Sequence, residues 1–204
     1  MESRGERKER TRRAIMDAAL ALCEDSSLVA LSLRQVAKEV GIVPTAFYRH
    51  FSSIDDLGLA LVEESFESLR EMLRDVRRSD PTYRNIIDSS VQVLVEHTRT
   101  QHAHFAFIAR ERLAGPPGVR AAIRHQIELV ERELATDLAR LTDPEHWSSE
   151  DLHVLSNMIV TSMVGTTEAI VTARPESQEA IVEQARTQLR MLLVGAYSWR
   201  SAEG

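Results

Sequence analysis

Residues 32–51 read Ser-Leu-Arg-Gln-Val-Ala-Lys-Glu-Val-Gly-Ile-Val-Pro-Thr-Ala-Phe-Tyr-Arg-His-Phe. Ser32, followed by Gln35 three residues later, forms a capping-box pattern that predicts the start of a short helix, and Gly41 predicts its end. Pro44 suits the first turn of a second short helix, which we expect to end near Phe51. Two short helices joined by such a tight turn are typical of a helix-turn-helix.

The apolar spacing predicts which side of the second short helix faces the protein. Phe47 and Phe51 lie four residues apart, so we expect both rings to point inward. The outward set is then Thr45, Ala46, Tyr48, Arg49 and His50. A short helix with such an exposed face can enter the major groove of DNA. The alternative is an ordinary pair of packed helices with a glycine cap and a solvated polar face, and this stretch alone fits both.

The rest of the 204-residue chain also has helical spacing, with apolar residues three and four positions apart and no alternating run that would build a strand. We therefore predict an all-α fold of about nine helices, three short ones up to residue 51 and longer ones after it. Ser53 with Asp56 caps a helix to about Arg78. Further breaks are expected at Asp80-Pro81, Gly115-Pro116-Pro117-Gly118, Asp143-Pro144, Ser148-Ser149 and Pro175. The predicted domains are residues 1–52 and 53–204.

Composition excludes several classes of protein. A hydrophobic share of 43% with 27% charged residues excludes a disordered chain. The single cysteine, Cys23, excludes an internal disulfide framework and an all-cysteine metal site. No stretch approaches the roughly 18 uninterrupted apolar residues of a membrane span, and the charged first residues do not form a signal peptide. We expect a cytoplasmic protein that does not associate with membranes.

The charge distribution differs between the two predicted domains. The net charge of -6 taken whole argues against a nucleic-acid-binding protein. Residues 1–50, however, carry nine basic and seven acidic side chains, a net charge of +2, which leaves -8 for the other 154 residues. The basic excess therefore coincides with the predicted helix-turn-helix, where DNA phosphates would lie.

Several segments in fixed register resemble the TetR family of repressors. They are Thr-Arg-Arg-Ala-Ile-Met-Asp-Ala-Ala at 11–19, the stretch 31–42, Phe-Tyr-Arg-His-Phe at 47–51 and Asp-Asp-Leu at 55–57, so the resemblance covers about residues 7–62. Shorter matches are similar to the repressors of unsaturated fatty-acid biosynthesis: residues 44–51, 56–59, 110–112 and 195–199. The resemblance implies a DNA-binding homodimer with a ligand pocket in helices four to eight and a dimer interface from helices eight and nine.

DNA-contacting residues follow from this pattern. We expect Arg4, Arg7, Lys8, Arg10, Arg12 and Arg13 to form a flexible arm along phosphates or in the minor groove. The helix that Ser32 caps offers free N–H groups to a phosphate. We expect Thr45 and Ala46 to contact bases, including a thymine methyl group, and Pro44 is a further candidate for contact with DNA. The resemblance implies phosphate contacts from Tyr48 and His50. Arg34 is either a contact or a solvated charge. Ile54 stands where many family members have a lysine, which removes one expected phosphate contact.

The resemblance to repressors of unsaturated fatty-acid biosynthesis implies a long-chain acyl-CoA as the ligand, and aliphatic and methionine side chains suit a flexible acyl chain. The candidate pocket residues are Phe66, Leu69, Met72, Leu73, Val91, Leu94, Val95, Phe105, Ile108, Met158 and Val164, although plain core packing is an alternative for each. Arg110 and Arg112 are candidates for the phosphates of coenzyme A, or else pair with surface acids. Pro116-Pro117 is a candidate pocket mouth.

The dimer interface is predicted from small residues that permit close helix approach. The candidates are Ser162, Gly165, Thr166 and Ala169, with Ala185, Leu189 and Leu192 of the last helix. The alternative is a stripe in the core of a single subunit.

No metal site, cofactor or catalytic centre is predicted. The five- and two-residue separations of His97, His102 and His104 do not place them on one helical face. No catalytic triad order or glycine-rich phosphate loop is present. The function we predict is a ligand-responsive repressor of lipid-metabolism genes, bound to a pseudo-palindromic operator. The alternatives are a regulator of efflux or drug-response genes with another hydrophobic ligand, and a helical enzyme that handles acyl-CoA.

Overall fold

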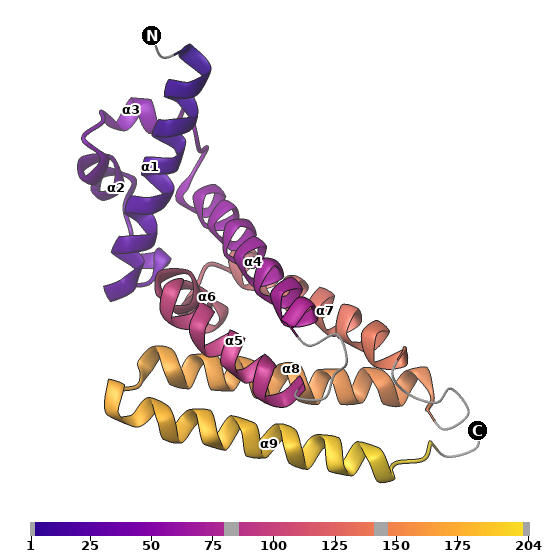
Figure 1. The fold of residues 1–204 in the computed structure, drawn as a ribbon. Helices are drawn as coiled ribbons and strands as arrows, with labels where there is room; N and C mark the ends of the chain where they lie inside the picture. The colour runs from indigo at the N-terminus through magenta and orange to yellow at the C-terminus, as the bar shows by residue number, and fades with distance from the viewer. Residues whose placement is uncertain (1–2, 80–85, 141–146, 202–204) are drawn as a thin grey trace. The chain divides into compact units, whose positions relative to one another are not determined.

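The computed structural model describes residues 3–79, 86–140 and 147–201, and all regular secondary structure in these ranges is helical (Figure 1). This confirms the predicted all-α fold. The helices are α1 (Arg4–Asp25), α2 (Leu33–Val40), α3 (Pro44–Phe47), α4 (Ile54–Ser79), α5 (Ile86–Thr100), α6 (His102–Ala114), α7 (Pro117–Ala139), α8 (Ser149–Thr172) and α9 (Gln178–Ser198), with short 3-10 turns η1 (Leu28–Ala30) and η2 (Pro175–Ser177).

The predicted start and end of the first short helix and the predicted start of the second are confirmed, but α3 ends at Phe47, before the predicted end near Phe51. The Ser32 Oγ accepts the Gln35 N–H at 3.2 Å, and the Gln35 side chain accepts the Ser32 N–H at 2.8 Å. Gly41 closes α2 with φ 73°, in the left-handed region that favours glycine. Pro44 opens α3. The predicted breaks at Asp80-Pro81 and Asp143-Pro144 lie outside the described residues.

The basic N-terminal segment is helical, so the prediction of a flexible arm was wrong. α1 begins at Arg4 and has 22 residues. Its start is a capping box in which the Ser3 Oγ accepts the Glu6 N–H at 3.1 Å and the Glu6 carboxylate accepts the Ser3 N–H at 2.7 Å. The basic side chains of residues 4–13 therefore project from the first turns of a helix.

The chain divides into two compact units, and the first consists of residues 1–69 and 101–124. In this unit α1 packs on both α2 and α6. Its core contains fully buried side chains of Ile15, Cys23, Val36, Phe47, Phe51, Leu57, Leu61, Phe107 and Ile123. The predicted domain boundary at residue 52 falls inside this unit, because α6 and the first part of α4 belong to the same compact unit as α1, α2 and α3. We refer to α1, α2 and α3 as the head.

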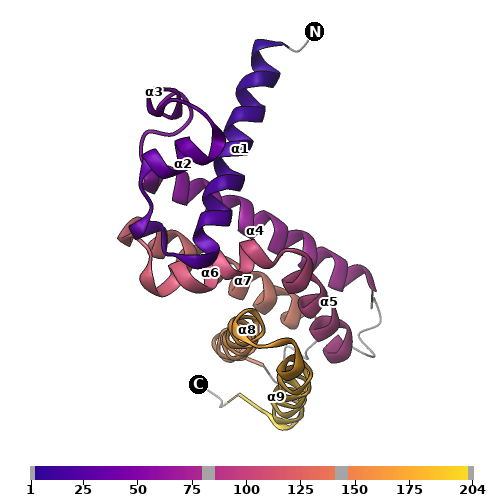
Figure 2. The same cartoon turned by 90° about the vertical axis from the view of Figure 1, so that its left-hand side faces the viewer.

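The second unit consists of residues 70–100 and 125–204. Within it α8 and α9 lie side by side, and both pack on α5 (Figure 2). The core they share contains Val91, Val95, Ile170, Val182, Ala185 and Leu189.

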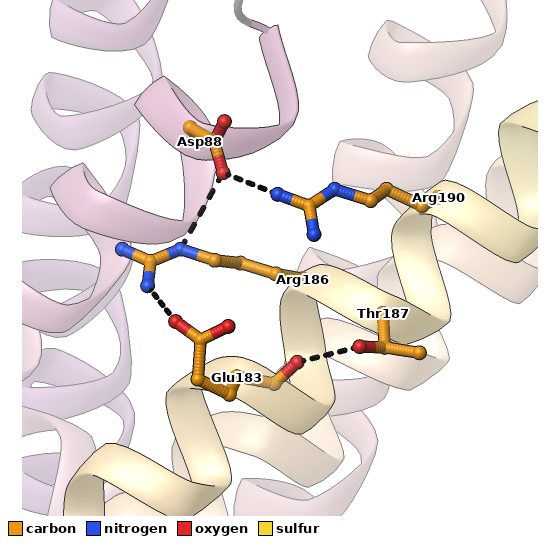
Figure 3. A network of polar contacts seen from close by, with 5 residues as sticks. All are labelled: Asp88, Glu183, Arg186, Thr187 and Arg190. Carbon is orange, nitrogen blue, oxygen red and sulfur yellow. Dashed lines mark hydrogen bonds and ion pairs between the residues drawn. The ribbon is translucent and has the colours of Figure 1, made fainter.

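Charged residues join α5 to α9 at the edge of this core (Figure 3). Asp88 Oδ1 lies 3.2 Å from Arg190 Nη2 and 3.5 Å from Arg186 Nε, and Arg186 also pairs with Glu183 on its own helix. Since Asp88 and Arg190 are half exposed, water weakens their pairing, and the apolar core contributes most of the stability of this contact.

Candidate nucleic-acid interface

The turn between α2 and α3 leaves one side of α3 exposed. Phe47 and Phe51 are buried, with their ring centroids 5.8 Å apart, as predicted from their spacing. Pro44, Thr45, Tyr48 and Arg49 are exposed, while Ala46 and His50 are half-buried. The rings thus anchor α3 to the first unit, and the face available to a partner is close to the predicted one.

Cationic groups surround His50, next to the exposed end of α3. The pKa of His50 is lowered, first by its partial burial and then by the positive charges of Lys8, Arg12 and Arg49, against a smaller opposing effect of Glu9. Lys8, Arg12 and Arg49 therefore place positive charge close to this ring. Such positive charge at the end of a candidate recognition helix suits the negative phosphates of DNA.

Arg12 and Arg13, both predicted DNA contacts, are engaged within the first unit. Arg12 Nη1 donates to the His50 carbonyl at 3.2 Å, and its guanidinium lies 4.3 Å from the centroid of the Phe51 ring. Arg13 pairs with Asp17 at 3.0 Å and with Glu64 at 2.5 Å. These contacts fix α1 to the end of α3 and to α4. Ser32 and Arg34 are exposed on α2, where their phosphate contacts stay predictions.

A partly buried histidine joins α6 to α4 in the same unit. His104 Nδ1 lies 3.0 Å from the Ser65 Oγ, whose own proton is donated to the Leu61 carbonyl at 2.7 Å. The ring therefore donates through Nδ1–H, and its Nε2 lies 3.8 Å from a Glu64 carboxylate oxygen. Burial lowers the pKa of His104, opposed by Glu64 and Asp17 and aided by Arg13.

This histidine makes the stability of the protein depend on pH. Because the pKa of His104 in the folded chain lies below its ordinary value of 6.5, the unfolded chain binds more protons in that window. We expect the free energy of unfolding to fall as the pH drops below about 6.5. His104→Gln should remove up to one proton from the slope of a urea-unfolding series between pH 5 and 7.5. His102→Gln, an exposed position on the same helix, should leave the slope unchanged, and an equal loss in both variants would contradict the assignment.

Two neighbouring charged side chains on α6 contact the end of α1 and the η1 turn that follows it. Arg110 Nη1 donates to the carbonyls of Cys23 at 2.6 Å and Ser26 at 2.8 Å, and Nη2 donates to the Glu24 carbonyl at 2.8 Å. These carbonyls are the unpaired acceptors at the end of a helix. A ligand phosphate would have to compete with all three for Arg110.

Glu111, the next residue, is fully buried. Its carboxylate accepts the Leu28 N–H at 2.9 Å and the Ser27 hydroxyl at 3.2 Å, and so caps η1. Burial, with the Glu111 charge, raises the pKa of the nearby Cys23 thiol to about 12, against a smaller opposing effect of Arg110, so this cysteine stays protonated. We refer to Arg110 and Glu111 with these partners as the α6 latch.

The predicted ligand residues are distributed over both units. Phe66, Met72, Val91, Leu94 and Val95 are buried; Leu69, Leu73, Phe105, Ile108, Arg112 and Val164 are half-buried; Met158 is 47% exposed. A hollow of about 450 Å³ in the second unit is lined by other, mostly charged residues: Arg70, Arg74, Glu133, Thr136, Asp137 and Arg140. The apolar set therefore stays a prediction.

The predicted dimer residues differ in their accessibility. Ala185, Leu189 and Thr166 are buried, and Ala185 and Leu189 belong to the core of the second unit. Ser162, Ala169 and Leu192 are half-buried, and Gly165 is exposed. Side chains already packed within one subunit have little surface left for a partner, so Ala185 and Leu189 fit the alternative of an intramolecular core.

The exposed residues of α8 and α9 form a set that shares only Gly165 with the predicted dimer residues. We define the outer stripe as Val154, Met158, Thr161 and Gly165 of α8 with Gln184, Gln188, Met191 and Gly195 of α9, all exposed. In the described part of the chain, α8 is the one helix long and apolar enough to cross a membrane by length and composition, with a mean hydropathy of 1.3. Of that window 28% is buried, and the exposed large apolar residues of α8 are Val154 and Met158.

Three side chains of this region escaped the sequence reasoning. Arg49 was expected to face outward but was given no role, Val43 was read only as part of the turn, and Glu111 was read as part of a motif or as a surface acid. A large apolar residue at a helix-capping position is a signal that was available for Val43. No signal in the sequence distinguishes the buried Glu111 from the many exposed glutamates.

Comparisons with known proteins agree with the helix-turn-helix of residues 32–51 and with the all-α fold. Residues 15–61 match the family described as bacterial regulatory proteins, tetR family. A transcriptional regulator from Rhodococcus sp. Rha1 is 19% identical with a TM-score of 0.71, over 90% of this chain and 96% of that one. The fatty acid degradation regulator FadR from Bacillus halodurans is 15% identical with a TM-score of 0.70, over 91% and 95%. The multidrug binding protein EbrR is 22% identical with a TM-score of 0.61, over 87% and 93%. At these identities the solved structures show a common fold.

Proposed function

We propose that this chain, with its TetR-type head and TetR-like fold, is a dimeric transcriptional repressor whose affinity for an operator responds to a long-chain acyl-CoA. The observation that carries the DNA-binding part is the exposed face of α3 beside the cationic surroundings of His50. Such a face can read bases while the cations neutralise phosphates. As a DNA-binding regulator, the protein would act in the cytoplasm.

The proposed DNA contacts are those that remain available on the surface of the head. Thr45 and Ala46 read bases, and Tyr48, Arg49 and Lys8 approach phosphates beside His50. Arg12 and Arg13 act indirectly, because they fix the first turns of α1 to α3 and α4. Two heads would read half-sites about 34 Å apart on a pseudo-palindromic operator.

Binding of the purified protein to a duplex from the region upstream of its own gene tests this function. We expect retention at moderate salt, with a log–log slope against salt that reports several phosphate contacts. Tyr48→Phe should weaken binding to all duplexes by about threefold to tenfold through one lost phosphate bond. The control is Tyr197→Phe on α9, because Tyr197 is 86% exposed and lies outside the outer stripe. If the wild type retains no duplex at any salt concentration, the repressor proposal fails.

The acyl-CoA part of the proposal rests on the aliphatic set in the body and on the sequence similarity to repressors of fatty-acid synthesis. The similar fold of FadR, a fatty acid degradation regulator, is consistent with this proposal. Arg110 is left out of the proposed ligand contacts, because three backbone carbonyls engage its guanidinium. The ligand would act by preferring one of two states that differ in the spacing of the heads.

The effector is tested by titrating the protein–duplex complex with oleoyl-CoA and palmitoyl-CoA, with free coenzyme A and oleate as controls. A change in duplex affinity by at least fivefold with an acyl-CoA, and none with the controls, is expected. Binding that ignores both acyl-CoAs removes the lipid assignment but leaves the repressor intact. A response to aromatic cations in place of acyl-CoA would favour a drug-response regulator. The multidrug binding protein EbrR, which has a similar fold, is consistent with that alternative.

A further inference from the structure

The residue before α3 lacks the serine cap with which five other helices of the described ranges begin. In the described ranges α1, η1, α2, α4 and α8 follow a serine whose Oγ accepts a backbone N–H: Ser3, Ser27, Ser32, Ser53 and Ser148. α3 follows Val43 and has no side-chain cap, and the same is true of α6, η2 and α9, which follow Gln101, Arg174 and Ser177. Valine is among the poorest residues for this position. Residue 43 therefore gives up a local stabilisation that the chain uses elsewhere.

Val43 also leaves its side chain in water. It is 64% exposed, whereas Phe47, on the inward side of α3, is fully buried. A single exposed apolar residue is common on protein surfaces. What sets Val43 apart is its place at the leading end of the candidate recognition helix, next to the exposed Pro44 and Thr45. Positions that break a local rule without a gain in packing are expected at functional sites.

The chemistry of valine narrows what this position can recognise. The first residues of a recognition helix contact base edges in the major groove. An isopropyl group has no hydrogen-bond donor or acceptor, so it cannot pair with the polar edge of any base. The apolar feature of that groove is the C5-methyl group of thymine. Serine at this position would cap α3 but would offer that methyl group no apolar surface.

We propose that Val43 is a specificity-determining residue that packs against the C5-methyl group of one thymine in each operator half-site. This inference rests on the proposed DNA-binding function. It adds a preference that the polar residues of α3 do not supply, since each methylene or methyl group removed from water favours the matched base by about fourfold.

The test removes the methyl group from the DNA. The duplex from the upstream region is first footprinted with the wild-type protein, and each thymine in the footprint is then replaced by deoxyuridine. Deoxyuridine at one symmetric pair of positions should lower the affinity of the wild-type protein by about fourfold per half-site. Val43→Ser should bind the unmodified duplex less tightly and should be insensitive to deoxyuridine at that same pair, with a thermal midpoint equal to or above that of the wild type.

The chain offers a matched control in Val29, which is also 64% exposed and lies in the same unit, on η1. Val29→Ser should keep both the affinity and the deoxyuridine sensitivity of the wild type. Thr45→Ser, which removes another methyl group, should change a different position or none. Sensitivity that survives in Val43→Ser, or no sensitive position at all, overturns the inference while the repressor stands. Absence of duplex binding by the wild type overturns the proposed function and this inference with it.

Discussion

Glu111→Ala should lower the free energy of unfolding by about 3 kcal/mol, one of the two largest effects that we expect from a single substitution. The alanine removes the acceptor of the Leu28 N–H and of the Ser27 hydroxyl in a place that water does not reach. A buried donor without a partner costs about 1–3 kcal/mol, and the lost hydrogen bonds to a carboxylate add to that cost. Urea unfolding followed by circular dichroism measures the change.

Two further variants separate the hydrogen bonds of the α6 latch from the loss of volume. Glu111→Gln keeps a carbonyl oxygen for the Leu28 N–H but presents an N–H group where an acceptor is needed, so we expect about half the loss. Glu63→Ala, which removes an exposed glutamate of α4, should change stability by less than about 0.5 kcal/mol. If Glu111→Ala is as mild as Glu63→Ala, the carboxylate does not support η1 as described.

The geometry around Glu111 explains why a larger residue cannot take the place of its neighbour Gly115. A Cβ atom there would lie 2.6 Å from the Glu111 carbonyl oxygen and 2.7 Å from Glu111 Oε2. The sequence analysis read Gly115 only as part of a break between two helices. Gly115 must also leave room for the buried Glu111 carboxylate. That requirement depends on how α6 contacts η1, which lies more than 80 residues earlier in the chain. Local patterns carry no information on such contacts.

The helix-turn-helix was predictable because its determinants are local. Ser32, Gln35, Gly41 and Pro44 each act within one or two turns of the chain, and the structure has all four in the expected roles. The flexible arm was wrong for a local reason as well. A capping box between Ser3 and Glu6 starts α1 early, and the charges of the segment masked that signal.

The choice of face on α9 was harder to predict. Small and apolar residues at 185, 189 and 192 have the spacing of a helix stripe, but that spacing does not tell a core within one subunit from an interface between two. In the structure Ala185 and Leu189 pack against Val91 and Ile170. The neighbouring stripe, one position round the helix, is the one left exposed.

A substitution in the outer stripe should give the second of the two largest effects. Met191→Glu, at a position 70% exposed in one subunit, should convert the proposed dimer to monomers and lower the affinity for a full operator by about 100-fold. A carboxylate placed in an apolar interface loses its hydration without gaining a partner, so association becomes unfavourable. Each head alone keeps its contacts, but two heads no longer bind as one ligand. Light scattering measures the mass, and full-site and half-site duplexes measure the affinity.

The matched control is Leu113→Glu, because Leu113 is a similar apolar residue on α6 that is 72% exposed. It should leave the protein dimeric, since the position is outside the outer stripe. The ratio of full-site to half-site affinity should collapse in Met191→Glu alone, while the half-site affinity of both variants equals that of the wild type. A Met191→Glu protein that remains dimeric places the interface elsewhere than on Met158, Gly165 and Met191. Loss of half-site binding in Met191→Glu would contradict the prediction, because a loss of dimerisation alone leaves the contacts of each single head unchanged.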